Sequence, residues 1–164
     1  NFNNWQIKER QEQEYVSDHI RRILQKAKWP NISYTGPYVK KAGNLLHLRT
    51  DFTTNVEELN GNIGYLLENL HPTPAVCGFH TKEALRIIQS TEKHDRQYYS
   101  GFLGPVGMEN CISLFVNLRC MRIAGNYLSL FTGAGITKDS VPNKEWKETE
   151  MKAVTLLSAI NTMN

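Results

Sequence analysis

Cysteine is scarce in this sequence, and long apolar runs are missing from it. The three cysteines, Cys77, Cys111 and Cys120, are widely spaced and form no CxxC pair. This pattern argues against a disulfide framework or a zinc site and favours a reducing compartment. No apolar run approaches the roughly 20 residues of a membrane-spanning helix. The stretch NFNNWQIKER also lacks the apolar core of a signal peptide. We therefore expect a cytoplasmic chain with no membrane segment.

The sequence also lacks a dominant charge, an initiator methionine and any familiar hydrolase motif. Its net charge is +3, and residues of both signs are mixed along the 164 residues. That is too little and too dispersed for nucleic acid, but it suits a small anionic ligand. No HxH, HExxH or nucleophile motif supports a serine, cysteine or zinc hydrolase. With 40% hydrophobic residues the composition is that of a globular protein. Because the chain does not begin with methionine, we interpret it as a piece of something longer.

The first half of the chain is dominated by helical periodicity. Apolar residues recur at three- and four-residue steps after Lys8, which predicts a helix to Ala27. The stretch WPNISYTGPY then interrupts the pattern with prolines and a glycine. The expected elements that follow are extended segments at Tyr38–Lys40 and Asn44–Thr50, and helices at Val56–Leu70 and Thr81–Glu92.

The second half changes to a period of two before a last helix. Strands are expected at Tyr98–Leu103, Cys111–Met121 and Tyr127–Thr132, and the last two are close enough in sequence for an antiparallel hairpin. A helix from Pro142 to Asn161 follows, with Ser140 as its cap. Helices separated from a block of antiparallel strands indicate an α+β fold.

Two helices carry glutamates three residues apart. On the last helix Glu145, Glu148 and Lys152 form one file at the shoulder of the apolar stripe. This file is either a solvated face, with a Glu148–Lys152 pair worth about 0.2–0.5 kcal/mol, or half of a metal site. On the first helix Glu9 and Glu12 share the face of the apolar residues, either because helix starts favour acidic residues or because they bind a cation. Carboxylate oxygens suit Mg²⁺.

Other candidate residues each have an ordinary alternative. Gly133 belongs to the GAG of LFTGAGITKDS, which is either a tight turn or a place where backbone N–H groups approach an anion. Arg119, placed on the strand ISLFVNLRC away from its apolar face, is either solvent-facing or a carboxylate clamp. Tyr99 suits a core position, and His47, in LLHLRT, suits a structural role on a strand.

Five segments follow one another along the chain: KERQEQEYV, LHPTPAVCGF, DRQYYSGFLG, NLRC and TGAGITKDSVPNKEWKETEMK. In this order they resemble the chorismate-utilising enzymes, and most closely the isochorismate synthases. The resemblance runs from about Lys8 to Ile160 and corresponds to the C-terminal part of such enzymes. HPTPAVCG is the discriminating motif, since anthranilate and aminodeoxychorismate synthases carry a different glycine-rich sequence there.

The resemblance assigns roles to the candidate residues. It implies that the chain is the C-terminal portion (1–164) of one chorismate-binding catalytic domain with the larger fold of that family, and that its partner is the N-terminal remainder. Glu12 and Glu148 are implied as the main Mg²⁺ ligands, with Glu9 and Glu145 beside them. The residues implied to hold chorismate are Tyr99, Arg119, the backbone at Gly133, and Lys152, with Ala75 lining the ring and His47 nearby.

The reaction implied is the reversible conversion of chorismate to isochorismate, which is expected to serve menaquinone biosynthesis or otherwise siderophore biosynthesis. Its general base and acid, a lysine and a glutamate in the family, have no match in these residues, so the chain alone is expected to be inactive. A salicylate synthase, an anthranilate synthase-type enzyme and a non-catalytic ligand- or metal-binding module are the alternatives. Two positions depart from the family: His80 replaces a usual proline and Thr132 a common alanine.

Overall fold

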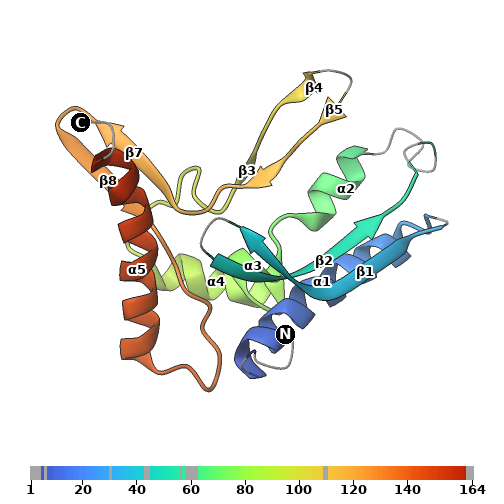
Figure 1. The fold of residues 1–164 in the computed structure, drawn as a ribbon, viewed down its shortest axis with the longest axis horizontal. Coiled ribbons are helices and arrows are strands. Elements are labelled where there is room, and N and C mark those ends of the chain that lie inside the picture. The colour runs from blue at the N-terminus through green and yellow to red at the C-terminus, as the bar shows by residue number, and fades with distance from the viewer. Residues whose placement is uncertain are drawn as a thin grey trace. The chain divides into compact units, whose positions relative to one another are not determined.

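The structure, a computed structural model, describes residues 5, 7–29, 31–42, 45–55, 57, 63–108 and 111–161. The chain divides into two compact units, Asn1–Ile87 and Ile88–Asn164, and the division falls inside one helix. Each unit combines helices with small antiparallel sheets (Figure 1). This is the α+β arrangement that the sequence predicts. No helix in the described part of the chain combines the length and the apolar character that crossing a membrane requires.

In the first unit the long helix α1 (Ile7–Lys26) packs against α2 (Ile63–Leu70), α3 (Pro74–Cys77) and β2 (Leu45–Thr53). Its buried apolar residues Ile23 and Leu24 belong to the stripe that predicts the helix. Burying such a side chain stabilises the fold by about 1.5–3 kcal/mol. The helix was expected at Lys8–Ala27, so the prediction is confirmed to within one residue at each end.

The strand β1 (Ser33–Ala42) pairs with β2 to form a long antiparallel ribbon. Both strands are longer than expected: the stretch SYTGPY continues β1 instead of interrupting it, and β2 runs on to Thr53. Gly36 and Pro37 lie at the irregularity between Thr35 and Tyr38, where the register shifts. Gly36 has φ +128°, and a Cβ there would lie 2.6 Å from the carbonyl oxygen of Arg49. Only glycine fits a backbone that approaches its partner strand this closely.

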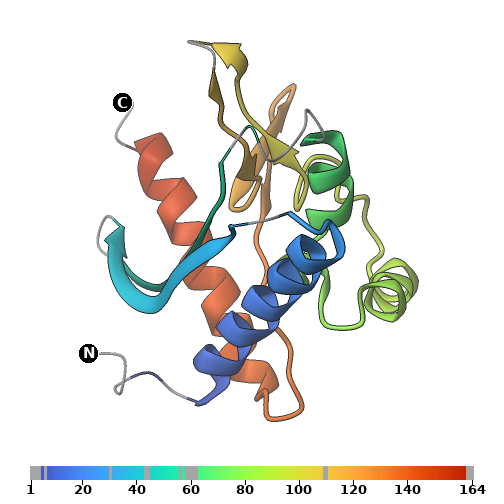
Figure 2. The same cartoon turned by 90° about the vertical axis from the view of Figure 1, so that its right-hand side faces the viewer.

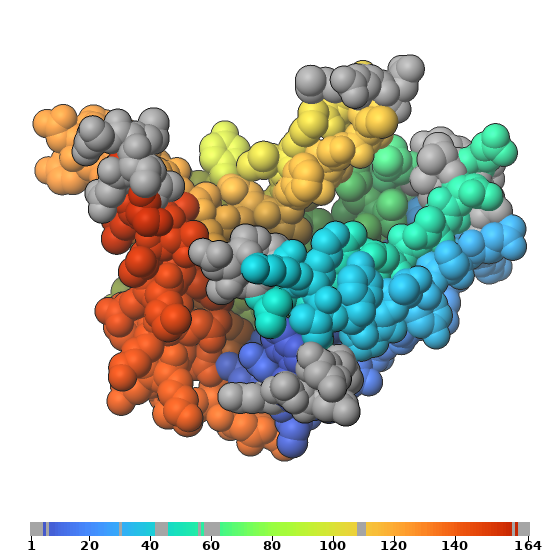
Figure 3. Space-filling view, viewed as in Figure 1, coloured from blue at the N-terminus to red at the C-terminus, as the bar shows by residue number. Residues whose placement is uncertain are grey.

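One face of the ribbon is turned toward α1 and the other away from it. The Thr50 hydroxyl accepts a hydrogen bond from Gln13 Nε2 at 3.1 Å. Successive strand residues point to opposite faces, so His47, Arg49 and Asp51 point away from α1. Asp51 accepts hydrogen bonds there from the hydroxyl of Tyr38, at 2.5 Å, and from Arg49 Nε, at 2.6 Å, and both bonds lower the pKa of its carboxyl. Side chains of the ribbon lie at the surface in Figure 3.

The remaining predicted helices of this part of the chain, α2 (Ile63–Leu70) and α4 (Thr81–Thr91), are both present. The helix expected at Val56–Leu70 is present as α2 from Ile63, and residues 56 and 58–62 lie outside the described residues. It ends before the HPTP segment, as predicted, and α3 is a short helix that periodicity did not indicate. The helix α4 (Thr81–Thr91) ends one residue earlier than expected.

The second unit corrects the strand predictions at 98–121. Residues 97–100 form a turn, so the expected strand Tyr98–Leu103 is reduced to β3 (Phe102–Leu103). The expected strand Cys111–Met121 is broken into three pieces, each pairing with a different partner. β6 (Phe115–Val116) pairs with β3, and β5 (Cys111–Ile112) with β4 (Val106–Met108). β7 (Cys120–Ala124) pairs with β8 (Tyr127–Phe131), which confirms the predicted last hairpin.

The last helix is confirmed at its predicted bounds. α5 (Pro142–Asn161) is one continuous helix with its proline in the first position, where the missing N–H costs nothing (Figure 2). The predicted cap is wrong, because Ser140 Oγ accepts a hydrogen bond from the backbone N–H of Thr137 at 2.9 Å. That hydroxyl closes the loop before the helix.

Candidate functional site

Lys152 connects α5 to the glycine-rich segment that follows β8. Its Nζ donates a hydrogen bond to the carbonyl oxygen of Gly133 at 2.7 Å. The same nitrogen forms an ion pair with Glu148 Oε1 at 2.6 Å, one helical turn earlier. The file predicted on this helix is therefore present, and it ends on the backbone of the GAG segment.

Tyr99 brings a third predicted residue to the same place. Its hydroxyl lies 2.5 Å from the point that a Cβ on Gly133 would occupy, so a larger residue at 133 would displace the tyrosine. The ring stacks on Phe131 of β8, with centroids 5.9 Å apart. Burial raises the pKa of the Tyr99 hydroxyl, which keeps it protonated and able to donate a hydrogen bond at neutral pH.

The arrangement of Tyr99, Gly133 and Lys152 suits an anion. An ammonium group has three N–H donors, and here two are directed to Gly133 and Glu148. Among the described residues the third has no partner, so it can be donated to a carboxylate, and the phenol of Tyr99 is another donor. Side chains from positions 99 and 152 thus converge on one backbone segment. We call these three residues the anion cluster.

Arg119 is not where the sequence placed it. The prediction of an arginine on a strand is wrong, because Arg119 occupies a bend between β6 and β7 with φ +48°. Left-handed backbone in a non-glycine residue costs about 1–2 kcal/mol. The next residue, Cys120, pairs with Phe131, the residue on which Tyr99 stacks. The bend therefore adjoins the anion cluster along the hairpin, and its half-buried arginine stays a candidate carboxylate ligand.

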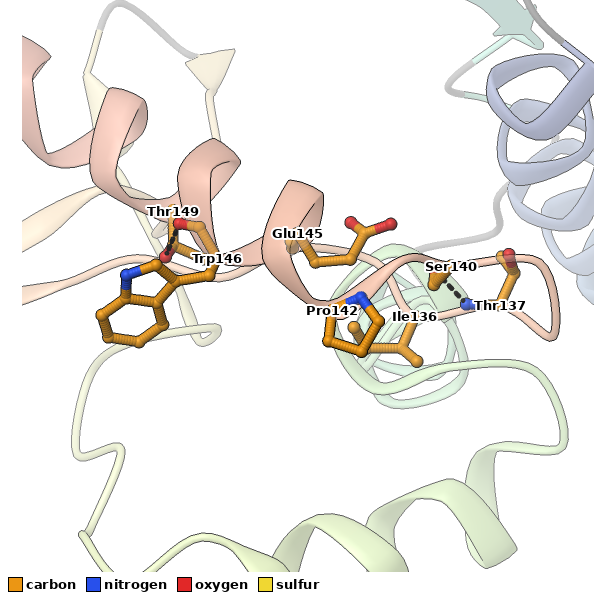
Figure 4. Close-up of a pocket in the computed structure, with 8 residues that line it drawn as sticks. Ile136, Thr137, Ser140, Pro142, Glu145, Trp146 and Thr149 are labelled. Atoms are coloured by element: carbon orange, nitrogen blue, oxygen red, sulfur yellow. Dashed lines mark hydrogen bonds between the residues drawn. The ribbon is translucent and has the colours of Figure 1, made fainter.

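Glu145 lies at the start of α5, at the edge of a cavity of about 350 Å³. Its side chain is buried, with 8% of the residue exposed, whereas Trp146 is 66% exposed. The Glu145 carboxylate and the Trp146 indole project in opposite directions (Figure 4). The cavity is lined by residues of the GAGIT segment, of the loop closed by Ser140 and of the first turns of α5, including Ala134, Ile136, Thr137, Ser140 and Thr149.

The predicted metal ligands are divided between the two units. Glu9 and Glu12 lie on α1 of the first unit, where Lys8 Nζ is 3.8 Å from Glu12 Oε1. Glu145 and Glu148 lie on α5 of the second. In neither unit do described His, Cys, Asp or Glu side chains form a group of three that could hold an ion. Each unit by itself offers one glutamate pair, and a shared ion stays a prediction.

His47 and Ala75, the remaining predicted site residues, both belong to the first unit. His47 lies on β2 as expected, exposed and opposite Lys40 of β1. Ala75 is exposed within α3, whose buried Cys77 directs its sulfur toward the carbonyl oxygen of Thr73 at 3.3 Å. Their predicted place beside the substrate ring stays a prediction.

The two departures from the family pattern differ in structural consequence. Thr132 lies half-buried directly after β8. His80 directly precedes α4, with its carbonyl accepting the Ala84 N–H, and has φ +57°. Proline cannot adopt that angle, because its ring fixes φ near −65°. The loop that carries the HPTPAVCG motif therefore ends in a conformation that the usual proline would forbid.

Substitutions at His80 test this conformation. We expect His80→Gly to raise the free energy of unfolding by about 0.5–1 kcal/mol, because glycine adopts positive φ without a steric cost. His80→Pro should lower it by more than about 1 kcal/mol. His80→Ala is the control, since alanine keeps the strain and removes only the imidazole, which contacts Phe79. The measurement is urea unfolding followed by circular dichroism. A proline variant as stable as the wild type would show that position 80 does not adopt positive φ in solution.

A polar network around Tyr99 was missed by the sequence analysis. Arg96 forms an ion pair with Glu92 and donates a hydrogen bond to Ser100 Oγ at 3.3 Å. Its guanidinium carbon lies 5.6 Å from the centroid of the Tyr99 ring. The spacing of Glu92 and Arg96, four residues, was the available signal, because it is the spacing of helical ion pairs.

Comparison with known proteins identifies the family. The family described as chorismate binding enzyme matches residues 5–161, nearly the whole chain. The chain therefore belongs to the chorismate binding enzyme family, as its motifs indicated.

Its relatives include several isochorismate synthases. The vibriobactin-specific isochorismate synthase of Vibrio cholerae is 33% identical over 146 residues, which are 88% of this chain and 36% of that protein. The isochorismate synthase EntC of Escherichia coli K12 is 33% identical over 153 residues, 92% and 38% respectively. The isochorismate synthase MenF of Haemophilus influenzae is 32% identical over 145 residues, which are 88% of this chain and 32% of that protein. The chain thus spans about a third of the length of these relatives.

Proposed function

We propose that this chain is the metal- and carboxylate-binding part of an isochorismate synthase, which interconverts chorismate and isochorismate. The observation that carries the proposal is the convergence of Tyr99, Gly133 and Lys152, which the family resemblance assigns to the substrate's carboxylates. The isochorismate synthases among the relatives support the same reaction.

In this reaction a water oxygen bonds to C2 of the ring, the double bond shifts, and the bond between C4 and its hydroxyl breaks. The role of the anion cluster is to bind and orient: Lys152 and Tyr99 donate hydrogen bonds to one carboxylate, and Arg119 clamps it. The general base and acid are proposed to lie in a part of the enzyme that precedes these residues.

Mg²⁺ fits the donors that the chain offers. Carboxylate oxygens are hard ligands, and Mg²⁺ takes one or two of them together with waters and substrate. Glu12 and Glu148 are proposed to hold the ion, with Glu9 and Glu145 beside them directly or through water. When bound, the ion supplies positive charge that neutralises the ring carboxylate of chorismate.

The test is the assay of the protein expressed from its whole coding sequence, with chorismate and with Mg²⁺ titrated. We expect isochorismate to form, with a rate that falls to background when the metal is chelated. The chain of residues 1–164 alone should give no turnover. A folded whole protein that leaves chorismate unchanged would refute the proposal, and salicylate as the product would replace it with a salicylate synthase. We also propose that the enzyme acts in menaquinone biosynthesis. This is tested by deleting its gene and asking whether added menaquinone restores growth.

A further inference from the structure

Arg96 is anchored to one carboxylate just after α4. Its Nε donates to Glu92 Oε2 at 2.7 Å, and its Nη2 donates to Oε1 of the same residue. Both side chains are partly buried, with 24% and 28% exposed. Two parallel hydrogen bonds fix the plane of the guanidinium group as well as its position. The bond from Arg96 also lowers the pKa of Glu92, so the carboxylate stays charged at neutral pH.

The anchored guanidinium contacts the Tyr99 segment at two points. Arg96 lies over the Tyr99 ring, where a cation is attracted to the ring face. Its Nη1 reaches the hydroxyl of Ser100, the next residue. Tyr99 is therefore held by Arg96 through its ring and through its neighbour, while its hydroxyl lies against Gly133.

The segment that Arg96 holds is strained. Gln97 and Ser100 flank the tyrosine pair with φ +50° and +67°. Left-handed conformations in such residues persist only where the surroundings impose them. Here Ser100 donates its backbone N–H to the carbonyl of Asn117 at 2.9 Å, and Asn117 Nδ2 donates to the carbonyl of Tyr98 at 2.9 Å. With Arg96, these bonds impose the turn that presents Tyr99.

We propose that Arg96 is a positioning residue that holds the Tyr99 phenol against Gly133 and Lys152, with Glu92 as its anchor. The proposal rests on the proposed function, because that function makes Tyr99 a substrate contact. Arg96 is not itself a ligand of the substrate. Its charge is matched by Glu92, which binds its Nε and Nη2, and its Nη1 donates to Ser100.

The test combines Arg96→Met, which keeps the length of the side chain but removes its charge and hydrogen bonds, with Arg96→Lys and Tyr99→Phe. The whole protein is labelled with ¹³C at tyrosine Cζ, and Tyr99→Phe identifies the resonance of Tyr99. Burial raises the pKa of this phenol, and so do the nearby Glu92 and Cys120, whereas the charge of Arg96 lowers it. Arg96→Met should therefore raise the pKa further, and Arg96→Lys should restore most of the difference.

Kinetics supply the second readout. A group misplaced by about 1 Å can lower the reaction rate about 100-fold. Arg96→Met should therefore lower kcat/KM for chorismate by about 10- to 100-fold. In a Tyr99→Phe background the same substitution should have little further effect, because the group that it positions is gone. Arg122→Met, which removes an exposed arginine on β7, is the control and should change neither readout.

The two readouts separate the possible failures. If the pKa of Tyr99 is the same in Arg96→Met and wild type, or if the kinetic losses of the two substitutions multiply, Arg96 does not position Tyr99. If the resonance shifts as expected while no variant, wild type included, uses chorismate, the positioning stands and the proposed function fails.

Discussion

Arg119→Ala is expected to lower kcat/KM for chorismate by about 30- to 5,000-fold in the whole protein. Truncating one partner of a desolvated charge pair typically costs about 2–5 kcal/mol, most of it because the other charge stays buried and unpaired. Chorismate carries two carboxylates, and the bend that holds Arg119 adjoins the residues against which Tyr99 packs. A substrate carboxylate that enters here loses its planar clamp in the variant.

The backbone at Arg119 provides a control that an ordinary surface arginine would not. Its φ of +48° is unfavourable for alanine but not for glycine. Arg119→Gly should therefore be more stable than Arg119→Ala while losing the same activity. Arg119→Lys should recover only part of the rate, because a point charge does not replace a bidentate fork.

Steady-state kinetics with chorismate, together with thermal unfolding of each variant, measure both properties. If Arg119→Ala and Arg119→Gly keep near-wild-type kcat/KM, the side chain is a solvated surface charge, and its assignment to the substrate is wrong. If the two variants are equally stable, the left-handed conformation is not maintained in solution.

Side-chain periodicity was sufficient for the long helices and insufficient for the short strands. α1 and α5 were predictable because an apolar stripe repeated over 20 residues specifies both the element and its ends. Between residues 98 and 121 the alternation of side chains continues through bends, so it does not show where the strands break. Those bends depend on backbone details: a Cβ on Gly104 would lie 1.9 Å from the carbonyl oxygen of Ser113, so only glycine fits.

The site could be predicted as a set of residues but not as an arrangement. The ordered motifs indicated Tyr99, Gly133 and Lys152 only through their resemblance to a family. That Lys152 bonds the carbonyl of Gly133 depends on how α5 returns along β8, which no local pattern encodes. The Glu92–Arg96 spacing is visible in the sequence, but it lies at the end of α4 and is equally typical of an ordinary surface ion pair. The structure adds the contact between Arg96 and the Tyr99 ring, which connects the ion pair to the anion cluster.

Lys152→Met is expected to lower kcat/KM for chorismate and to raise the affinity for Mg²⁺. Lys152 donates to Gly133 and pairs with Glu148, a proposed metal ligand. Without the ammonium, a substrate carboxylate loses a cation, and kcat/KM should fall by at least about 30-fold. Glu148 meanwhile loses a competitor of the metal. Because the pair is partly exposed, this gain is limited to about 1 kcal/mol, or about fivefold in Mg²⁺ affinity without substrate.

Two further variants separate charge from geometry. Lys152→Arg keeps the positive charge but cannot reproduce a compact ammonium that reaches Gly133, so it should restore less than half of the lost rate. Lys147→Met, which removes an exposed lysine from the same helix, should leave both affinities unchanged. Calorimetric titration of Mg²⁺ without chorismate, and kinetics at saturating Mg²⁺, measure the two quantities separately. A fall in both kcat/KM and Mg²⁺ affinity would mean that Lys152 supports the fold of α5 and β8. An unchanged kcat/KM would mean that the Glu148–Lys152 pair is an ordinary surface ion pair.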